Sequence, residues 1–439
     1  MIDPLFPAAA LLTALIVGLP FAQPPALSRD EQRLAALVDD QRDAALALLE
    51  QAVNINSGTQ NFAGVREVGR LFEAELTALG FTTRWVDGAV FQRAGHLVAD
   101  HPGQGPRILL IGHLDTVFEA DSPFQKFERL DARTARGPGI IDMKGGDVVM
   151  IAALKALKAA GALDRMNLVV VMNGDEEAAG RPLAAARAAL TDAARGAEIA
   201  IGFEDGPADP KLAVTARRGT TEWRLTVTGT AAHSSQVFRE DIGYGAIYEL
   251  ARVINGFREK LAGEAHLTFN PGVLLGGTTV EFDQVPSRGS AFGKSNVIAE
   301  RAVAAGDLRA LSAEQFQQAR QVMERIAAAS LPHTQSTITF DEGYPPMAPT
   351  EGNARLLAMY DKASRDLDFG SVTAVSPDRA GAADVSFVAG TIGTIIDGVG
   401  LMGKGDHTVG ETADLTTLPS QTKRMALLLH RIQQAGGVR

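Results

Sequence analysis

Short, almost wholly apolar runs alternate with longer helix-like segments in the first half of the chain. The runs are RILLIG (107–112), MNLVVVM (166–172) and AEIAIGF (197–203), and an example of the segments between them is GDVVMIAALKALKAAG (146–161). A strand without polar alternation is buried on both faces, which is typical of parallel sheets covered by helices. The sequence therefore predicts an α/β fold in which a mostly parallel sheet is sandwiched by helices.

A different pattern begins near residue 213. Trp223, Leu225 and Val227 alternate with polar residues, as expected of a half-exposed antiparallel strand. A helix, two strands, a second helix and a last strand follow, which completes the order of a ferredoxin-like module. We therefore expect an inserted ferredoxin-like α+β domain at 215–330, within a larger α/β domain built from 28–214 and 331–439.

The first 27 residues have the character of an export signal followed by a linker. Their apolar core, at about 8–22, is shorter than the ~20 residues that span a bilayer, and QPPALS interrupts it. A cleaved signal predicts a periplasmic or secreted protein without stable membrane association. No Lys or Arg precedes the core, and Pro20 weakens the cleavage site. An uncleaved anchor and a misassigned start codon are therefore the alternatives, and without a signal the protein would be cytoplasmic.

Composition limits the partners and the kind of metal site. The net charge is −10 and no long basic stretch occurs, which argues against nucleic-acid binding because phosphates require clustered Lys and Arg. The chain has no cysteine. Any metal site must therefore use His, Asp and Glu.

Possible metal ligands follow four apolar runs, the fourth being TIIDGVGLM (394–402). In chain order these residues are His113, Asp115, Glu176, Glu177, Glu204, Asp205 and His407, and Asp142 lies in a Gly-rich loop ahead of a helix. Each residue alone reads as an ordinary loop or capping residue. Ligands of parallel sheets bind at the carboxyl ends of the strands, so the set together predicts one site.

The donor types in this set indicate the metal. Two imidazoles with several carboxylates suit Zn²⁺, with Mn²⁺ or Co²⁺ as alternatives. One zinc ion needs about four ligands, and the set is larger. We therefore expect two ions that share a bridging carboxylate at a separation of ~3.5–4 Å.

Glu176 and Glu177 raise a geometric problem because neighbouring side chains on a strand point to opposite faces. Both can reach one site only if the strand ends before them. We therefore predict that the strand ends by Asn173 or Gly174 and that the two glutamates lie in the following turn.

An ordered set of motifs carries a resemblance to a known family. The motifs are GHLDTV, GPGIIDMKGG, GDEEAAG, GFEDG and GDHTVGE. Their order resembles the co-catalytic di-zinc exopeptidases of the aminoacylase and glutamate carboxypeptidase group, over residues 30 to 435. The resemblance implies a zinc exopeptidase-like fold whose inserted domain acts as a lid and as the dimerisation domain of a homodimer.

The resemblance also implies a role for each ligand. Asp142 would bridge the two ions, His113 and Glu204 would complete one zinc site, and Glu177 and His407 the other.

Two further residues take roles beside the metals in this resemblance. Asp115 would orient His113 by a hydrogen bond. Glu176 would be the general base, taking a proton from a metal-bridging water and passing it to the leaving amine.

Substrate-binding residues are implied in the inserted domain. His233 in GTAAHSS would reach the active site of the partner subunit, and Asn296 and Arg309 would hold a substrate carboxylate or carbonyl. Gly381 matches a substrate-loop glycine loosely. Arg217 and Arg218 open the inserted domain. Lining the cleft is one alternative for them, but two adjacent basic residues more often form a solvated hinge, which is our interpretation.

The functional hypothesis is a zinc-dependent hydrolase that cleaves an amide bond of a small peptide or N-acyl amino acid. GPGIIDMKGG and FEDG are most similar to the glutamate carboxypeptidase branch. A deacylase or dipeptidase of other specificity is the main alternative. A catalytically silent binding protein is disfavoured because Glu176 and Asp142 are both retained, and a nucleotide-dependent enzyme because no phosphate loop is present.

Overall fold

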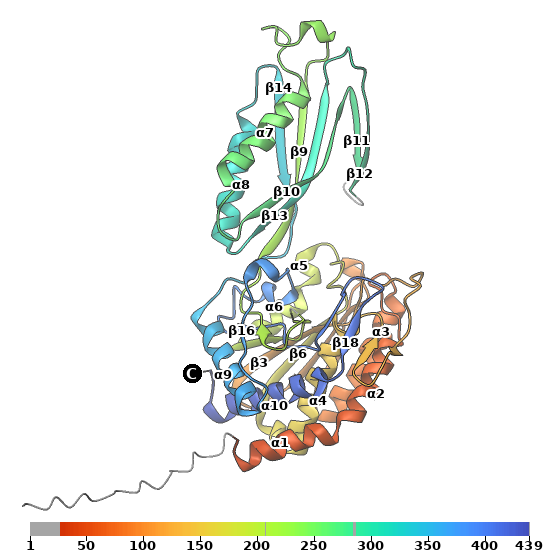
Figure 1. Cartoon of the computed structure of the whole chain (residues 1–439), viewed down its shortest axis with the longest axis vertical. Coiled ribbons are helices and arrows are strands. Elements are labelled where there is room, and N and C mark those ends of the chain that lie inside the picture. The colour runs from red at the N-terminus through yellow and green to blue at the C-terminus, as the bar shows by residue number, and fades with distance from the viewer. Residues whose placement is uncertain (1–26, 207, 284–286, 439) are drawn as a thin grey trace, which may run out of the picture.

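Two units of unequal size make up the computed structural model, which describes residues 27–206, 208–283 and 287–438 (Figure 1). The larger unit holds both the early and the late parts of the chain, and the smaller one is formed by its middle. The expected signal peptide and linker, 1–27, lie outside the described residues apart from Leu27. In the described part of the chain, no helix is long and apolar enough to cross a membrane.

A six-stranded sheet forms the centre of the larger unit. Its order is β1 (Thr82–Asp87), β2 (Gly95–His101), β6 (Met166–Asn173), β3 (Gln104–His113), β7 (Ile199–Gly202) and β16 (Ile395–Ile396). β6, β3, β7 and β16 pair in parallel, whereas β2 is antiparallel to both β1 and β6. The prediction of a mostly parallel sheet is confirmed.

Helices cover both faces of this sheet because its strands are apolar on both sides. Ile108 and Leu110 of β3 pack into one core, while Leu109 and Ile111 pack into another. The first core is covered by α1 (Arg29–Asp40), α2 (Arg42–Val53), α3 (Phe62–Leu79), α4 (Lys144–Ala159), α9 (Glu351–Asp366) and α10 (Thr417–Ala435). The second is covered by α6 (Ala188–Ala194) and residues 375–392, with α5 (Leu183–Ala186) next to α6.

The smaller unit is the expected ferredoxin-like domain. Its elements in chain order are β9 (Gly219–Gly229), α7 (Ala246–Leu261), β10 (Thr268–Gly277), β13 (Arg301–Ala310), α8 (Ala313–Ala328) and β14 (Thr334–Phe340). The strands pair antiparallel in the order β10-β13-β9-β14, and Trp223, Leu225 and Val227 are buried against the helices. In the sequence, a separate hairpin of β11 (Thr279–Asp283) and β12 (Arg288–Phe292) connects β10 to β13, which are themselves neighbours in the sheet.

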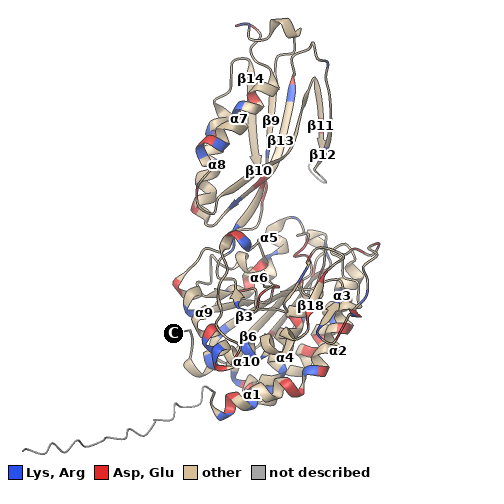
Figure 2. Cartoon of the chain, viewed as in Figure 1, with Lys and Arg blue, Asp and Glu red and all other residues tan. Residues whose placement is uncertain are grey.

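The end of the inserted domain differs from the prediction. β14 pairs with β9 from Thr334 to Phe340, and Ile338 and Phe340 pack against the core of this domain. The domain therefore extends to Phe340, beyond the expected boundary at 330, because its fourth strand completes the sheet. Figure 2 shows Lys and Arg interspersed with Asp and Glu along its helices α7 and α8.

Short elements connect the two parts of the larger unit. A small sheet joins β17 (Gly403–Lys404), β18 (Thr412–Asp414), β5 (Thr134–Arg136) and β4 (Glu128–Arg129), and β8 (Leu212–Ala213) pairs with β15 (Thr373–Ala374). Single 3₁₀ turns occur at Ala89–Phe91, Leu163–Arg165, Ser234–Gln236, Pro377–Arg379 and Asp384–Phe387. The small sheet holds the loop that carries His407 beside the segment that leads to Asp142.

Candidate metal centre

Neighbouring strands deliver the predicted ligands to one edge of the central sheet. His113 is the last residue of β3, and Glu204 follows β7, which pairs with β3. β6 ends at Asn173, and Glu176 and Glu177 lie in the turn beyond it. The predicted end of this strand is confirmed, so strand alternation does not separate the two glutamates.

Close packing at the start of α4 places Asp142 against the same edge. Asp142 lies just before this helix, and a β-carbon on Gly146 in its first turn would overlap the carbonyl oxygen of Phe203. The glycine therefore allows the helix to approach the end of β7. His407 arrives on the loop after β17 with a φ of 58°, in the left-handed region that non-glycine residues rarely adopt.

The five predicted ligands form two groups that share Asp142. His113 Nε2 lies 3.1 Å from Asp142 Oδ1 and 3.7 Å from Glu204 Oε1. His407 Nε2 lies 2.9 Å from Asp142 Oδ2 and 3.1 Å from Glu177 Oε2. One carboxylate oxygen of Asp142 therefore faces each group, as a bridging ligand requires.

The spacing of these donor atoms fits metal ions. Ligands ~2.0–2.1 Å from a tetrahedral zinc lie about 3.3 Å from one another, and the four separations between an imidazole nitrogen and a carboxylate oxygen run from 2.9 to 3.7 Å. Each group offers three donors, which leaves a coordination position open for water or substrate. The residues present thus fit two divalent cations.

The pKa values at the candidate centre are shifted by burial and by several carboxylates that lie close together. Burial would raise the pKa of Asp142, but hydrogen bonds from His113 and His407 outweigh it and lower that pKa. The hydrogen bond that His407 donates to Asp142, followed by the one that it donates to Glu177, raises the pKa of His407 to about 11. Burial raises the pKa of Glu177 to about 7. The carboxylates of the group outnumber its imidazoles, and two cations would balance this excess of negative charge.

Asp115 holds the residues around it in place. Its carboxylate is fully buried and accepts hydrogen bonds from the backbone N–H groups of Glu176 (2.9 Å) and Glu177 (3.2 Å), and from the Thr59 hydroxyl (2.6 Å). Its Oδ1 lies 3.5 Å from His113 Nδ1, and its carbonyl oxygen is nearer to that nitrogen, at 3.1 Å. Asp115 therefore contacts the turn that carries Glu176 and Glu177 as well as the histidine that it was expected to orient.

Glu411 is a site residue that the sequence reasoning did not assign. Its buried carboxylate accepts the backbone N–H groups of Gly139, Ile141 and Asp142 at 2.9–3.3 Å, and burial raises its pKa to about 7. These bonds fix the loop that presents Asp142, the residue shared by the two candidate ligand groups. Glu411 is the last residue of the GDHTVGE motif, so its place beside His407 was a usable signal.

A cavity of about 450 Å³ opens beside the metal ligands. Its lining includes the acidic residues and the histidine Asp142, Glu176, Glu204, Asp205 and His407, and also Arg217, Arg379, Gly381 and Lys404. Gly381, which matched the expected substrate loop only loosely, does face this cavity. Both carboxylates and cations therefore surround the space next to the ligands.

The interpretation of Arg217 as a solvated hinge residue is wrong. Its side chain is buried, with Nε 2.8 Å from Asp397 Oδ2 and a terminal nitrogen donating to the Gly381 carbonyl at 2.7 Å. Asp397 also accepts the N–H of Glu204 at 3.3 Å. The pairing with a buried aspartate explains why a cation tolerates this position.

The three expected substrate residues of the inserted domain do not line this cavity. His233 is exposed and contacts the Ser235 hydroxyl through Nδ1 at 2.8 Å. Asn296 is exposed, and Arg309 pairs with Asp307 at 2.8 Å. Within a single chain they stay apart from the metal ligands, so their roles remain predictions that require a second subunit.

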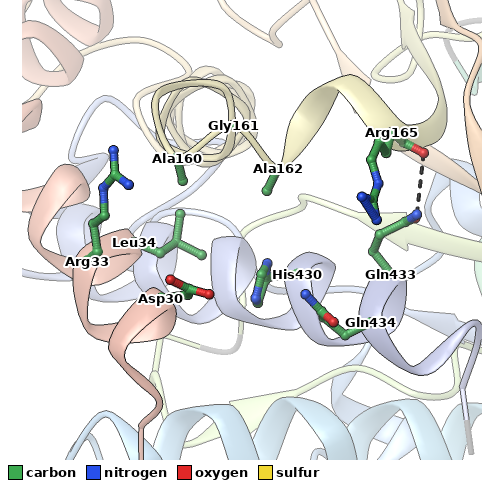
Figure 3. A pocket seen from close by; sticks show the side chains of 10 residues that line it. All are labelled: Asp30, Arg33, Leu34, Ala160, Gly161, Ala162, Arg165, His430, Gln433 and Gln434. Atoms are coloured by element: carbon green, nitrogen blue, oxygen red, sulfur yellow. Dashed lines mark hydrogen bonds between the residues drawn. The ribbon is translucent and has the colours of Figure 1, made fainter.

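A separate polar pocket lies where α1, the end of α4 and α10 meet (Figure 3). Asp30, Arg33 and His430 face it, and Gln433 donates to the Arg165 carbonyl at 3.3 Å along its rim. Neither group of potential metal ligands found among the described residues lies in this pocket. We therefore place the candidate active site at the carboxyl edge of the central sheet, where both groups lie.

Comparison with known proteins gives this arrangement a family. Residues 109–431 match the description of peptidase family M20/M25/M40. The chain belongs to this family. It is 28% identical over 430 residues to carboxypeptidase G2 from Pseudomonas sp. (strain RS-16), a match that covers 96% of each chain. Family membership shows a hydrolase of the metallopeptidase type.

Solved structures of two peptidases share the fold of the chain. Aminopeptidase PepT from Bacillus cereus ATCC 10987 superposes with a TM-score of 0.70 and 17% identity, over 89% of this chain and 99% of its own. The Bacillus subtilis YXEP protein is described as a dinuclear metal-binding peptidase from the M20 family. It superposes with a TM-score of 0.61 and 16% identity, over 90% of this chain and 99% of its own. Both comparisons bear on the fold.

Proposed function

We propose that the protein is a two-zinc exopeptidase or amidohydrolase that cleaves an amide bond of a small peptide or N-acyl amino acid. The observation that carries this proposal is the position of Asp142, whose two oxygens face the His113 group and the His407 group separately. Mn²⁺ or Co²⁺ could replace zinc, since the donors are nitrogen and oxygen only.

The residues of the chain divide the reaction between them. When bound, the two ions would polarise the substrate carbonyl and make water a stronger nucleophile near neutral pH. Glu176 lines the cavity beside the ligands and would accept the proton of the attacking water, then return it to the nitrogen of the leaving amine. Asp115 would keep Glu176 in place through its backbone N–H.

Two features support a substrate with a carboxylate, such as a C-terminal glutamate. Carboxypeptidase G2 aligns over 96% of both chains. Arg379 and Lys404 line the cavity and make no side-chain ion pair with the other described residues. Their charge suits a carboxylate beside the scissile bond.

A deacylase is the second candidate. A probable succinyl-diaminopimelate desuccinylase from Staphylococcus aureus (strain MRSA252) is 32% identical over 181 residues, which cover 39% of this chain and 42% of that protein. Because that match spans less than half of either chain, it supports a deacylase less well than the full-length relative supports a carboxypeptidase.

We also propose a homodimer that forms through the inserted domain, in which His233 of each subunit stabilises the developing oxyanion in the site of the other. Asn296 and Arg309 would bind the substrate carboxylate or carbonyl there. Export to the periplasm or the medium, directed by the first 27 residues, completes the proposal.

A substrate panel tests this function. The zinc-loaded protein would be assayed on acyl-glutamates, other N-acyl amino acids and dipeptides, and again after dialysis against a chelator. We expect hydrolysis of C-terminal glutamate substrates, its loss on chelation and its return with Zn²⁺ or Co²⁺. A fully loaded protein that hydrolyses no member of the panel would instead be a silent binding protein.

A further inference from the structure

The turn that carries Glu176 rests on a buried arginine. Arg187 is 1% exposed, and its guanidinium lies 2.6 Å from Asp175 Oδ1 and 2.8 Å from Asp384 Oδ1. It also donates to the Asp175 carbonyl at 3.2 Å. Asp384 in turn accepts from the side-chain amide of Asn173, at the end of β6, at 2.6 Å. The arginine thus fixes the backbone just before Glu176.

Tyr344 connects this arginine to Glu176 directly. Its hydroxyl accepts a hydrogen bond from Arg187 at 2.7 Å and donates one to the Glu176 carbonyl at 2.8 Å. Burial raises the pKa of Tyr344 well above its usual 10, so the hydroxyl keeps its proton at neutral pH. The ring packs on Phe387 with centroids 4.8 Å apart. One side chain therefore holds the carbonyl of Glu176 in a fixed position.

Tyr344 also lies on the segment by which the chain returns from the inserted domain. Its carbonyl accepts the N–H of Thr220 at 2.9 Å, and Met347 exchanges two backbone hydrogen bonds with Arg217 at 2.9 and 3.0 Å. These bonds join the outgoing and the returning segments. The contact to Glu176 therefore starts from the connection between the two domains.

We propose that Tyr344, held by Arg187, is a positioning residue for Glu176 and ties its place in the site to the connection between the domains. The inference rests on the proposed role of Glu176 as general base. Tyr344 does not need to touch the substrate, because it acts through the backbone of the base. Without its hydroxyl, the Glu176 carbonyl and one Arg187 N–H lose their partner in a buried setting.

The test compares two tyrosines. Tyr344→Phe removes the hydroxyl and keeps the ring, while Tyr360→Phe does the same at a buried tyrosine of α9 whose hydroxyl meets Gln421 at 3.4 Å. We expect Tyr344→Phe to lower kcat about tenfold, with KM within twofold and bound zinc unchanged. Tyr360→Phe should lower the melting temperature at most and leave kcat unchanged.

A double variant that carries both Tyr344→Phe and Glu176→Gln distinguishes the positioning of Glu176 from a general disturbance of the active site. If Tyr344 acts through Glu176, then Tyr344→Phe should not reduce the residual rate of Glu176→Gln any further. Should Tyr344→Phe fold poorly, Arg187→Lys, which keeps the charge but loses the planar contacts, undergoes the same comparison. Unchanged kcat, an equal fall in Tyr360→Phe or additive losses would overturn the inference. Wild-type turnover in Glu176→Gln alone would overturn the proposed function instead.

Discussion

The larger unit gathers its expected ligands within one chain, whereas the inserted domain keeps its expected substrate residues outside the same cavity. In one ligand group, the mostly buried carboxylates of Asp142 and Glu204 both lie within 3.7 Å of His113 Nε2. His233 and Asn296 are exposed on the inserted domain. The difference indicates that the fold of one chain brings the candidate ligands together, while substrate contacts by His233 or Asn296 would require a second subunit or a domain movement.

The largest expected effect is on kcat and concerns Glu176, the proposed base of the metal centre within one chain. Glu176→Gln removes a proton acceptor but no proposed ligand, so kcat should fall about 10²–10⁴-fold while both metals stay bound. Steady-state kinetics and metal analysis of the same preparation check this prediction. Loss of zinc together with activity would mean that Glu176 is a ligand, and the division of roles between the adjacent glutamates would be wrong.

Glu177→Gln should break the same centre in a different way. A neutral amide is a poor zinc ligand, so the His407 group would lose its ion and the bound zinc would approach one per chain. Turnover would fall with it and recover in part at high Zn²⁺ concentration. Titration of zinc content against added metal measures this, and two tightly held ions in the variant would refute the assignment of Glu177.

The sequence was sufficient for residues whose positions follow from chain topology. Apolar strands predicted the parallel sheet, and its carboxyl edge predicted where His113, Glu177 and Glu204 meet. The sequence did not reveal that Arg217 is buried, because its partner Asp397 lies far along the chain. The same holds for Tyr344 and Arg187, whose contacts depend on tertiary packing, which no local pattern encodes.

The boundary at 330 shows a related limit. TQSTITF (334–340) has the alternation of a half-exposed strand, but its partner β9 begins at Gly219. The order of elements already counts this strand as the last of the ferredoxin-like module, and its long-range pairing with β9 fixes the end of the domain at Phe340.

An intermediate effect tests whether the inserted domain completes the centre of a partner. His233→Ala should lower kcat about 10²-fold, as expected when one oxyanion donor is removed. Chains with His233→Ala would then be mixed with Glu176→Gln chains after partial unfolding and refolding. If His233 acts in trans, mixed dimers contain one intact site, and activity should return to about a quarter of the wild-type value. No recovery in confirmed mixed dimers would place His233 with its own site or outside catalysis.

The smallest effect separates the stability of the inserted domain from the chemistry of the centre. Glu249 on α7 accepts hydrogen bonds from Arg252, Ser336 and the Leu331 N–H at 2.7–3.1 Å. Although burial would raise its pKa, these contacts lower it. The folded pKa is thus below the unfolded one, so the stabilisation is present at neutral pH and is lost as the pH falls through the folded pKa.

Glu249→Gln should therefore lower the free energy of unfolding by about 1 kcal/mol at pH 7, and the difference from wild type should shrink in acid. Glu259→Gln, at an exposed position on the same helix, serves as the control with little change at either pH. Denaturant unfolding at both pH values measures the effect, and zinc content and kcat should not move. If kcat fell with Glu249→Gln while zinc was retained, the inserted domain would be coupled to the chemistry within its own chain, and the contrast between the two regions would no longer hold.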